Sequence, residues 1–219
     1  MSRVAVIGAH RRTGAHVVTQ LLAAGHAVVG TVRDPEHVAA LHADGATGVV
    51  VDLMTATPEE LTAVLTGTDA VVYAAGSGWG DTRDLVERLD RDAIMTAADA
   101  SVAAGVGRFV LVSAHRTDED LGDPVVDVLL RAKRTADADL RGTVLGWTII
   151  RPDALTQGAQ TGGVHVGTTV PHGAIARADL AALIVAVLAD PTMTHQQFDV
   201  IGGDTRTADA INSLRGFVD

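Results

Sequence analysis

The sequence predicts an α/β fold with a doubly wound parallel sheet, and three observations support this. Short apolar segments alternate with helical segments at roughly 20- to 30-residue intervals. No signal for a strand-to-strand hairpin appears in the first two thirds of the chain. Hydrophobic residues make up 47% of the 219 residues and aromatic residues only 3%. Cores built from small aliphatic side chains are typical of parallel strands that are covered by helices on both faces.

The first segment, Val4–Val18, has the pattern of a strand, a tight turn and a helix. The strand is expected at about Arg3–Ile7, and the turn begins at Gly8. Apolar residues recur with helical spacing from Thr13, and Gly25 is a typical residue to end that helix. This order is how a nucleotide-binding βαβ unit begins.

The other elements follow in order along the chain. Further strands are expected at about Ala27–Val32, Gly48–Val51, Asp69–Tyr73, Arg108–Ser113, Trp147–Arg151 and Phe198–Ile201. Further helices are expected at about Pro35–Ala43 with Asp34 as the N-cap, after a capping box at Thr57 and Glu60, and at Leu85–Ala104, Val125–Leu140 and Ala178–Leu188. The sequence therefore predicts alternating strands and helices over most of its length.

The segment Asp153–Ala176 differs from its surroundings because it is rich in Gly, Thr and Gln. We expect it to form an irregular lid or a small extra hairpin that shapes the substrate pocket. The length of the chain suits one large domain. We therefore expect a single domain over residues 1–219, with residues 153–176 as its lid or substrate segment.

Composition and charge restrict the partners. Asp and Glu number 27 against 17 Lys and Arg, which gives a formal net charge of -10. No stretch clusters positive charge, so nucleic acid is not an expected partner. The chain has no cysteine, and neither a signal peptide nor a membrane-spanning run is apparent. We expect a cytoplasmic protein that binds a small-molecule substrate and no membrane; its oligomeric state is left open.

The turn after the first strand is the candidate phosphate-binding site. In a parallel sheet of this kind, ligands bind beyond the carboxyl ends of the strands. The free N–H groups of the helix that starts at Thr13 suit a pyrophosphate, Gly8 permits the turn, and Gly14 lets the helix approach the strand. Arg11 stands where a middle glycine is expected, and it either displaces the phosphate or blocks it. A turn without a ligand is the alternative.

The end of the second strand bears on the choice of nicotinamide cofactor. An acidic residue there would bind the ribose hydroxyls, but here Val32 is followed by Arg33. A guanidinium suits a 2′-phosphate, so Arg33, together with Arg12 and Arg11, favours NADP. Alternatively, Arg33 is a solvated loop charge.

Two later strand ends also have residues suited to a dinucleotide. Asp52 either accepts a hydrogen bond from an adenine amino group or caps the turn that follows it. Ala74, Ala75 and Gly76 carry little side-chain bulk, so a cofactor ribose could lie over them. The predicted cofactor site thus draws on the ends of four strands.

The ordered motifs resemble a known family. G-A-x-x-x-T-G, V-R-D-P, V-D-L, A-A-G, A-G-V-x-R-F-V-L-V-S, W-T-I-I-R-P and A-R-A-D-L-A follow one another from Val4 to about Ile211. This series resembles the atypical short-chain dehydrogenase/reductases of the NAD(P)H-binding, NmrA-like group, which have a Rossmann-type fold. The resemblance implies that the dinucleotide is lined by Gly8, His10, Arg12, Thr13, Gly14, Arg33, Asp52, Leu53, Ala75 and Gly76. Arg11 departs from the family pattern.

Catalytic residues are harder to assign. Many short-chain dehydrogenases use a Tyr-x-x-x-Lys pair, in which the lysine lowers the pKa of the tyrosine. Here Lys133 is present, but Leu129 takes the place of the tyrosine. Lys133 either contacts the nicotinamide ribose or is a surface lysine of its helix. Ser113 matches the family's serine at the end of the fifth strand, where it contacts substrate or nicotinamide; alternatively, it satisfies the backbone.

His115 is the best remaining titratable group near the predicted site, and its ordinary pKa suits proton exchange near neutral pH. The other histidines show no compact metal-ligand spacing, so no metal site is expected. The hypothesis is an NADPH-dependent oxidoreductase that transfers hydride to a flavin, a quinone or a small carbonyl acceptor, with the proton from water or His115. The alternatives are an NADP(H)-binding redox sensor of the NmrA type, motivated by the missing tyrosine, and a fold whose phosphate site Arg11 has closed.

Overall fold

A computed structural model describes residues 1–10, 12–77 and 81–215. Within these residues, the strands of the main sheet are β1 (Arg3–Ile7), β2 (Ala27–Val32), β3 (Thr47–Val50), β4 (Ala70–Tyr73), β5 (Arg108–Val112), β6 (Gly146–Pro152), β8 (Gly163–Gly167), β10 (Gln196–Gly202) and β11 (Thr205–Arg206). A separate parallel pair consists of β7 (Ala154–Thr156) and β9 (Ala174–Ala176). All the strands predicted from the sequence are present, with ends that shift by a few residues at most.

The order of the main sheet is β11-β8-β10-β6-β5-β4-β1-β2-β3. The run from β3 to β10 is parallel throughout, whereas β8 is antiparallel to both β10 and β11. β1 and β4 are neighbours in the sheet. From β1 the chain adds β2 and β3 on one side, and from β4 it adds β5 and β6 on the other, so the strand order reverses between β1 and β4. The sheet is therefore doubly wound, as predicted, and its switch point lies at the carboxyl ends of β1 and β4.

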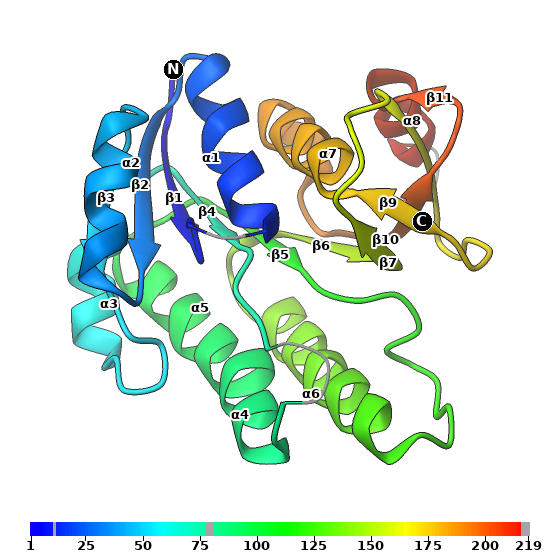
Figure 1. Ribbon diagram of the computed structural model, residues 1–219, viewed down its shortest axis with the longest axis horizontal. Helices are drawn as coiled ribbons and strands as arrows, with labels where there is room; N and C mark the ends of the chain where they lie inside the picture. The colour runs from blue at the N-terminus through cyan, green and yellow to red at the C-terminus, as the bar shows by residue number, and fades with distance from the viewer. Residues whose placement is uncertain (11, 78–80, 216–219) are drawn as a thin grey trace.

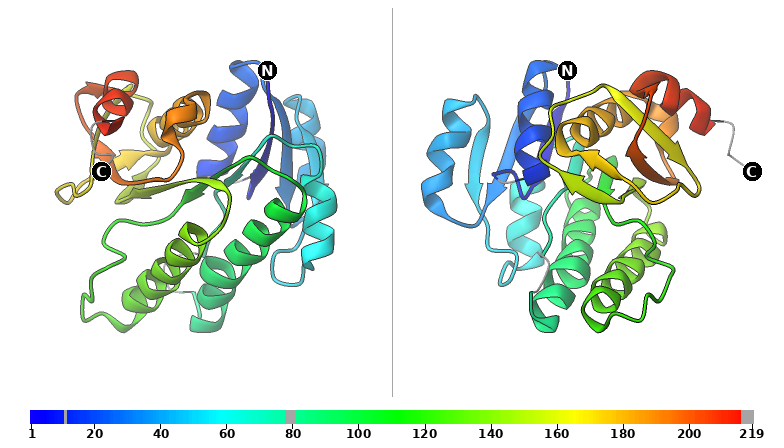
Figure 2. Two further views of the ribbon diagram at one scale, coloured as in Figure 1. Left: turned by 180° about the vertical axis from the view of Figure 1, so that it is seen from behind. Right: turned by 45° about the vertical axis from the view of Figure 1, so that its right-hand side comes forward.

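Helices cover both faces of the sheet (Figures 1 and 2). The helices of one face are α1 (Arg12–Ala23), α2 (Val38–Ala43), α7 (Arg177–Ala189) and α8 (Thr207–Leu214). Those of the other face are α3 (Pro58–Leu65), α4 (Arg83–Glu87), α5 (Ala93–Ala103) and α6 (Pro124–Arg141). Three short helical segments are also present. They are the 3-10 helices η1 (Pro35–His37) and η3 (Pro191–Met193) and the π-helical turn η2 (Arg88–Asp92). None of the described helices is long and apolar enough to cross a bilayer.

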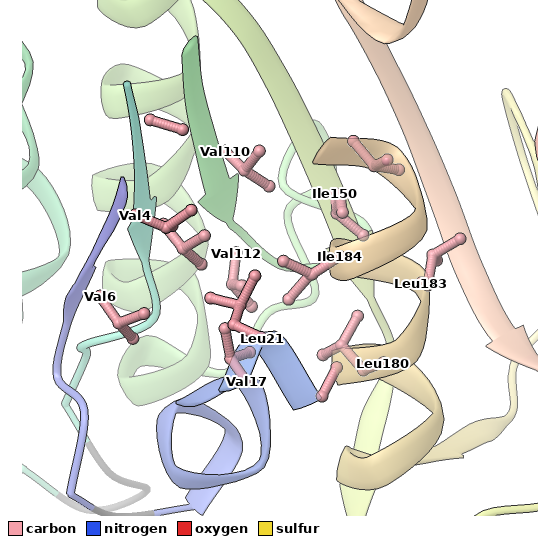
Figure 3. Close-up of a cluster of buried hydrophobic side chains, with 14 of the residues drawn as sticks. Val4, Val6, Val17, Leu21, Val110, Val112, Ile150, Leu180, Leu183 and Ile184 are labelled. Carbon is pink, nitrogen blue, oxygen red and sulfur yellow. The ribbon is translucent and has the colours of Figure 1, made fainter. Parts of the chain in front are cut away.

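The core consists of two apolar layers, one on each face of the sheet. In the first layer, Val17 and Leu21 of α1 meet Leu180 and Ile184 of α7 above the central strands (Figure 3). The second layer contains the buried aromatic ring of Phe109 beneath α5 and α6. Among the described residues, helices cover both faces of the sheet, so a ligand can approach the parallel strands at their ends.

Two helix ends, the start of α3 and the end of α1, have the structure that their local sequences predict. Thr57 and Glu60 form a reciprocal capping box, with Glu60 N donating to Thr57 Oγ1 at 3.2 Å and Thr57 N donating to the Glu60 carboxylate at 2.9 Å. Gly25 has a φ of 82° just after α1, a conformation that favours glycine.

Three predictions need correction or refinement. Asp34 lies at the N-cap position of η1, but its side chain makes no capping hydrogen bond. The long helix expected at Leu85–Ala104 begins earlier, after the N-cap Thr82, and η2 interrupts it with a π-helical turn. The segment Asp153–Ala176 contains three strands, one of which joins the main sheet, so it is more regular than a lid or a single hairpin.

Candidate functional site

The turn between β1 and α1 lies at the switch point and fits only glycine at two positions. Gly8 has a φ of 85°, and a Cβ there would lie 2.8 Å from the backbone nitrogen of Ala75. A Cβ on Gly14 would lie 1.9 Å from the carbonyl oxygen of Gly8. The two glycines therefore allow the chain after β1, the start of α1 and the end of β4 to meet without side chains between them. Arg11, which the sequence singles out, lies outside the described residues.

The start of α1 gathers positive charge. Arg12 has a φ of 53° and is exposed. At the start of α7, burial and the charge of Arg12 lower the pKa of Arg177, whose Nε is buried without a hydrogen-bond partner among the described residues. Gln20 Nε2 donates to Ala178 O at 2.8 Å and ties the two helices together. The N-terminus of α1 and the two arginines, whose charges interact, favour an anion near this turn.

The end of β2 presents an exposed arginine and a stacked pair of imidazoles. The Arg33 side chain is 70% exposed, and its Nε lies 3.6 Å from Asp34 Oδ1. The rings of His10 and His37 stack with centroids 3.4 Å apart and 17° between their planes. Asp34 Oδ2 also lies 3.8 Å from His37 Nδ1, and the Asp34 side chain makes no capping hydrogen bond, so the capping role that the sequence suggested is not realised. His37 is a member of this region that sequence reasoning missed.

The residues that follow β3 and β4 are held by local hydrogen bonds. Asp52 Oδ1 accepts a hydrogen bond from Met54 N at 3.0 Å, so the turn-capping alternative is realised. Leu53 packs partly buried against the second apolar layer, and Thr13 is buried beneath the first turn. Ala74 N donates to Ile7 O at 3.0 Å, which continues the β1–β4 pairing into the turn.

A buried ion pair lies beneath the end of β4. Lys133 Nζ is 2.9 Å from Asp90 Oδ1, and both side chains are buried. A Cβ on Gly76 would lie 2.9 Å from the same carboxylate oxygen, and Ser77 N donates to its other oxygen at 3.0 Å. Burial opposes the ionisation of Asp90, but Lys133 and Ser77 outweigh it and lower its pKa. Lys133 is therefore not a surface lysine.

Tyr73 does not serve as the missing acid. Its side chain is fully buried in β4, and its hydroxyl donates to Leu89 O at 3.0 Å. Burial and the charge of Asp90 raise the pKa of Tyr73 far above its ordinary value. The phenol is thus held protonated and turned away from the strand end.

Ser113 leads into a network of buried charges between the sheet and α6. Arg151 donates from Nε to Asp137 at 2.9 Å and from Nη1 to Asp118 at 2.8 Å. Burial raises the pKa of Asp137 despite Arg151 and an interaction with the Ser113 hydroxyl. Neither Ser113 Oγ nor Asp137 Oδ1 has a well-formed hydrogen bond within the described chain. The serine hydroxyl is buried at the end of β5, next to this network. Arg151 also lines an open groove of about 370 Å³.

His115 lies between two carboxylates. It is 8% exposed, its Nδ1 lies 3.6 Å from Asp153 Oδ2, and its Nε2 lies 3.4 Å from Asp199 Oδ2. Burial raises the pKa of Asp199, although His115 and Arg151 oppose this shift. The backbone N–H of His115 donates to Pro152 O at 2.9 Å and so extends the β5–β6 pairing to this residue.

Sequence reasoning missed Asp90, Asp137 and Asp199. One signal was available for Asp137, which follows Lys133 by one helical turn and so shares its face of α6. Asp199 is opposite Arg151 in the β10–β6 register, but β10 follows β6 by a long connection, so this pairing is not visible in the sequence. Asp90 lies in η2, where the π-helical turn shifts the apolar periodicity.

Comparisons with known proteins fit this geometry. Residues 8–191 match the NAD(P)H-binding family. The Bacillus subtilis protein YhfK, named an uncharacterized sugar epimerase, is 33% identical over 97% of this chain and 100% of its own length.

Two solved structures share the fold. One, from Bacillus halodurans, bears a name that proposes an NAD-dependent epimerase/dehydratase; it is 30% identical, with a TM-score of 0.90 over 97% of this chain and 100% of its own. The other, named the oxidoreductase ylbE from Lactococcus lactis, is 24% identical, with a TM-score of 0.85 over 97% of this chain and 96% of its own. The second likeness concerns the fold alone.

Proposed function

Because the chain belongs to the NAD(P)H-binding family of the atypical short-chain dehydrogenase/reductases, we propose that it is an NADPH-dependent oxidoreductase. The observation that carries the proposal is the close approach of Gly8, Gly14 and Ala75 at the switch point, where an added Cβ on either glycine would clash. This is where a dinucleotide pyrophosphate binds in doubly wound sheets. The assignment to the NmrA-like group within the family stays a prediction.

The proposed cofactor site combines five strand ends. The pyrophosphate would lie on the first turn and the helix N-terminus, the adenosine beyond β2 and β3, and the nicotinamide ribose beyond β4 and β5. The proposed cofactor-binding residues are Gly8, His10, Arg11, Arg12, Thr13, Gly14, Arg33, Asp52, Leu53, Ala74, Ala75, Gly76 and Ser113. The Asp52 side chain already caps its own turn through Oδ1, so an adenine contact would use the other oxygen.

The proposed preference for NADP rests on Arg33. Its guanidinium is largely exposed at the end of β2, and a 2′-phosphate could displace its loose contact with Asp34. Asp34 and Glu36 flank the same place with negative charge, and each lies near His37. We therefore expect a preference set by one strong cation, without a closed phosphate pocket around it.

The acceptor is proposed to be a flavin, a quinone or a small carbonyl compound. Leu129 replaces the tyrosine of the usual pair, and Asp90 neutralises Lys133. Flavins and quinones accept hydride without a dedicated phenolic acid, so they suit this site best. We propose that Ser113 positions the acceptor or the nicotinamide, that Lys133 positions the loop at Gly76, and that the proton comes from water or His115.

The test measures NADPH oxidation at 340 nm with a panel of flavins, quinones and carbonyl compounds, alongside calorimetric titration with NADP, NADPH and NAD. Turnover with at least one acceptor is the expected result. Saturable NADPH binding without turnover on any acceptor would instead favour a redox sensor, which the missing tyrosine also allows. Absence of binding would mean that the first turn no longer accepts the pyrophosphate.

The cofactor preference has a matched pair of variants. Arg33→Ala should weaken NADP(H) binding about 10-fold, the loss expected for one charge-assisted contact, and leave NAD binding unchanged. Arg83→Ala removes another exposed arginine, which pairs with Glu87 away from β2, and should change neither affinity. Equal NADP(H) affinity in the Arg33→Ala variant and the wild type would refute the 2′-phosphate assignment.

A further inference from the structure

Three potential metal ligands from three separate segments meet at the carboxyl edge of the sheet. His115 follows β5, Asp153 follows β6, and His172 precedes β9. Each offers one ligand atom, and these atoms all lie within 4.8 Å of one another. Asp153 Oδ2 is central, at 3.6 Å from His115 Nδ1 and 3.2 Å from His172 Nδ1.

His115 Nδ1 is a buried nitrogen without a hydrogen-bond partner among the described residues. Its other nitrogen, Nε2, faces the Asp199 carboxylate at 3.4 Å. A proton on Nε2, held by Asp199, leaves the Nδ1 lone pair directed at the point that Asp153 also faces. A carboxylate behind a histidine is the arrangement that orients metal-binding imidazoles.

The other two ligands are supported as well. Gly173 N donates to Asp153 Oδ2 at 2.9 Å and holds the carboxylate in place. His172 is 65% exposed, so the cluster opens to solvent on its side. Its Nε2 lies 2.7 Å from Arg116 Nη1, and Arg116 also pairs with Glu119. When the His172 Nδ1 lone pair binds a cation, the neutral imidazole carries its proton on Nε2. Nε2 is then a donor, so Arg116 would turn away and Glu119 could accept from Nε2.

We propose that His115 Nδ1, Asp153 Oδ2 and His172 Nδ1 form a binding site for a divalent transition metal, with Zn²⁺ as the best match. Two bonds of about 2.1 Å at the tetrahedral angle separate ligand atoms by about 3.4 Å, and the two measured separations lie on either side of that value. Two imidazoles and one carboxylate favour zinc over magnesium or calcium, which bind oxygen ligands.

Three protein ligands leave a fourth position for water or a substrate oxygen, as in zinc sites that act on substrates. The site would lie two residues beyond Ser113, on the side proposed for the acceptor. The site shares His115 with the proposed hydride transfer, although it involves none of the residues assigned to the dinucleotide. With the metal bound, His115 Nδ1 is occupied, so the proton for an acceptor would come from water.

The experiment titrates the full chain, free of affinity tags and treated with a chelator, with Zn²⁺ by calorimetry and with Co²⁺ by visible absorption. One ion per chain is expected, with ligand-field bands for Co²⁺ that Zn²⁺ removes. His172→Gln and Asp153→Asn should each weaken binding by more than about 10-fold. His165→Gln, an exposed histidine on the neighbouring strand β8, should leave it unchanged.

Binding of NADP(H) by the wild type and each variant is measured in parallel. A variant that loses both metal and NADP(H) binding is misfolded, whereas a wild type that binds metal but not NADP(H) contradicts only the cofactor proposal. His172 is exposed, so its replacement is expected to fold. Absence of saturable 1:1 binding below millimolar metal in the wild type would overturn the site. Equal weakening by His165→Gln would also overturn it, because scattered surface histidines would then explain the binding.

Discussion

At the residue scale, Gly14 is the position where one added carbon has the largest consequence. Its Cβ would lie 1.9 Å from the carbonyl oxygen of Gly8, and backbone on both sides cannot yield without moving α1 from β1. Gly14→Ala should therefore destabilise the protein by about 2 kcal/mol or more and abolish NADP(H) binding. Urea denaturation and calorimetric titration measure the two effects.

Gly107→Ala is the matched control. A Cβ at Gly107 would meet only Asp69 O, at an ordinary 3.7 Å. Its stability should change by about 1 kcal/mol at most, and cofactor binding should be intact. If Gly14→Ala behaves like this control, α1 does not pack against the turn as described.

The Asp90–Lys133 pair gives a pH-dependent prediction. Lys133→Met leaves a buried carboxylate without its cation and should cost about 3 to 5 kcal/mol at pH 7. Because folding lowers the pKa of Asp90, the contribution of the pair is complete above the ordinary carboxyl pKa of about 4. It is lost as the pH falls through the lowered value. The difference between wild type and variant should therefore shrink in acid.

Urea denaturation at pH 7 and at about pH 2.5, well below the ordinary carboxyl pKa, measures this difference. Arg131→Met removes an exposed cation from the same helix, and its effect should be within about 0.5 kcal/mol at both pH values. A Lys133→Met penalty that stays constant with pH would show that lost packing, and not the charge of Asp90, accounts for it.

Residue roles were predictable from the sequence where they depend on neighbours along the chain. Gly8 and Gly14 follow from the pattern of strand, turn and helix, and both lie where a side chain could not fit. The partners of Lys133 and His115 come from distant segments, and no local pattern marks Asp90 or Asp199. Burial of a charge is a tertiary property, so sequence reasoning left Lys133 open between the ribose and the surface.

At the scale of single elements, the capping box at α3 offers a direct test. Thr57 accepts from Glu60 N and donates its own N–H to the Glu60 carboxylate. Thr57→Ala should cost about 1 kcal/mol, which urea denaturation resolves. Thr55→Ala, whose hydroxyl makes one long contact of 3.5 Å with Asp52 O, should cost less than half as much. Both side chains are exposed, so equal losses would mean that the capping hydrogen bond does not set the effect.

Element boundaries were well predicted where caps and glycine mark them, as at α1 and α3. The region from Leu85 to Ala104 was harder, because a steady apolar spacing predicts one regular helix. The π-helical turn η2 adds a residue to the local repeat and brings Asp90 to the buried side. Such turns often occur at functional sites, and here the turn supplies the partner of Lys133.

At the scale of the whole molecule, alternation of strands and helices predicted the doubly wound parallel sheet. It did not predict that β8 adds to the sheet beside β10, because Gly163–Gly167 lies in a segment of weak periodicity. This addition places the loop with His172 beside the ends of β5 and β6. The cluster of His115, Asp153 and His172 is thus a product of topology, and sequence spacing alone argued against a metal site.

The proposed dinucleotide site spans both halves of the sheet, since it uses the ends of β1 and β2 on one side of the switch point and of β4 and β5 on the other. A bound cofactor should therefore stabilise the chain as one unit. NADPH at about 100 times its Kd should add about 2.7 kcal/mol and raise the Tm by about 5 to 10 °C. The same concentration of NAD should raise it less, because it has no 2′-phosphate for Arg33.

Differential scanning calorimetry compares the two cofactors on the wild type and on Arg33→Ala, where the difference between them should disappear. Equal shifts for both cofactors on the wild type would contradict the NADP preference, and a second transition that the cofactor does not move would contradict a site shared by both halves.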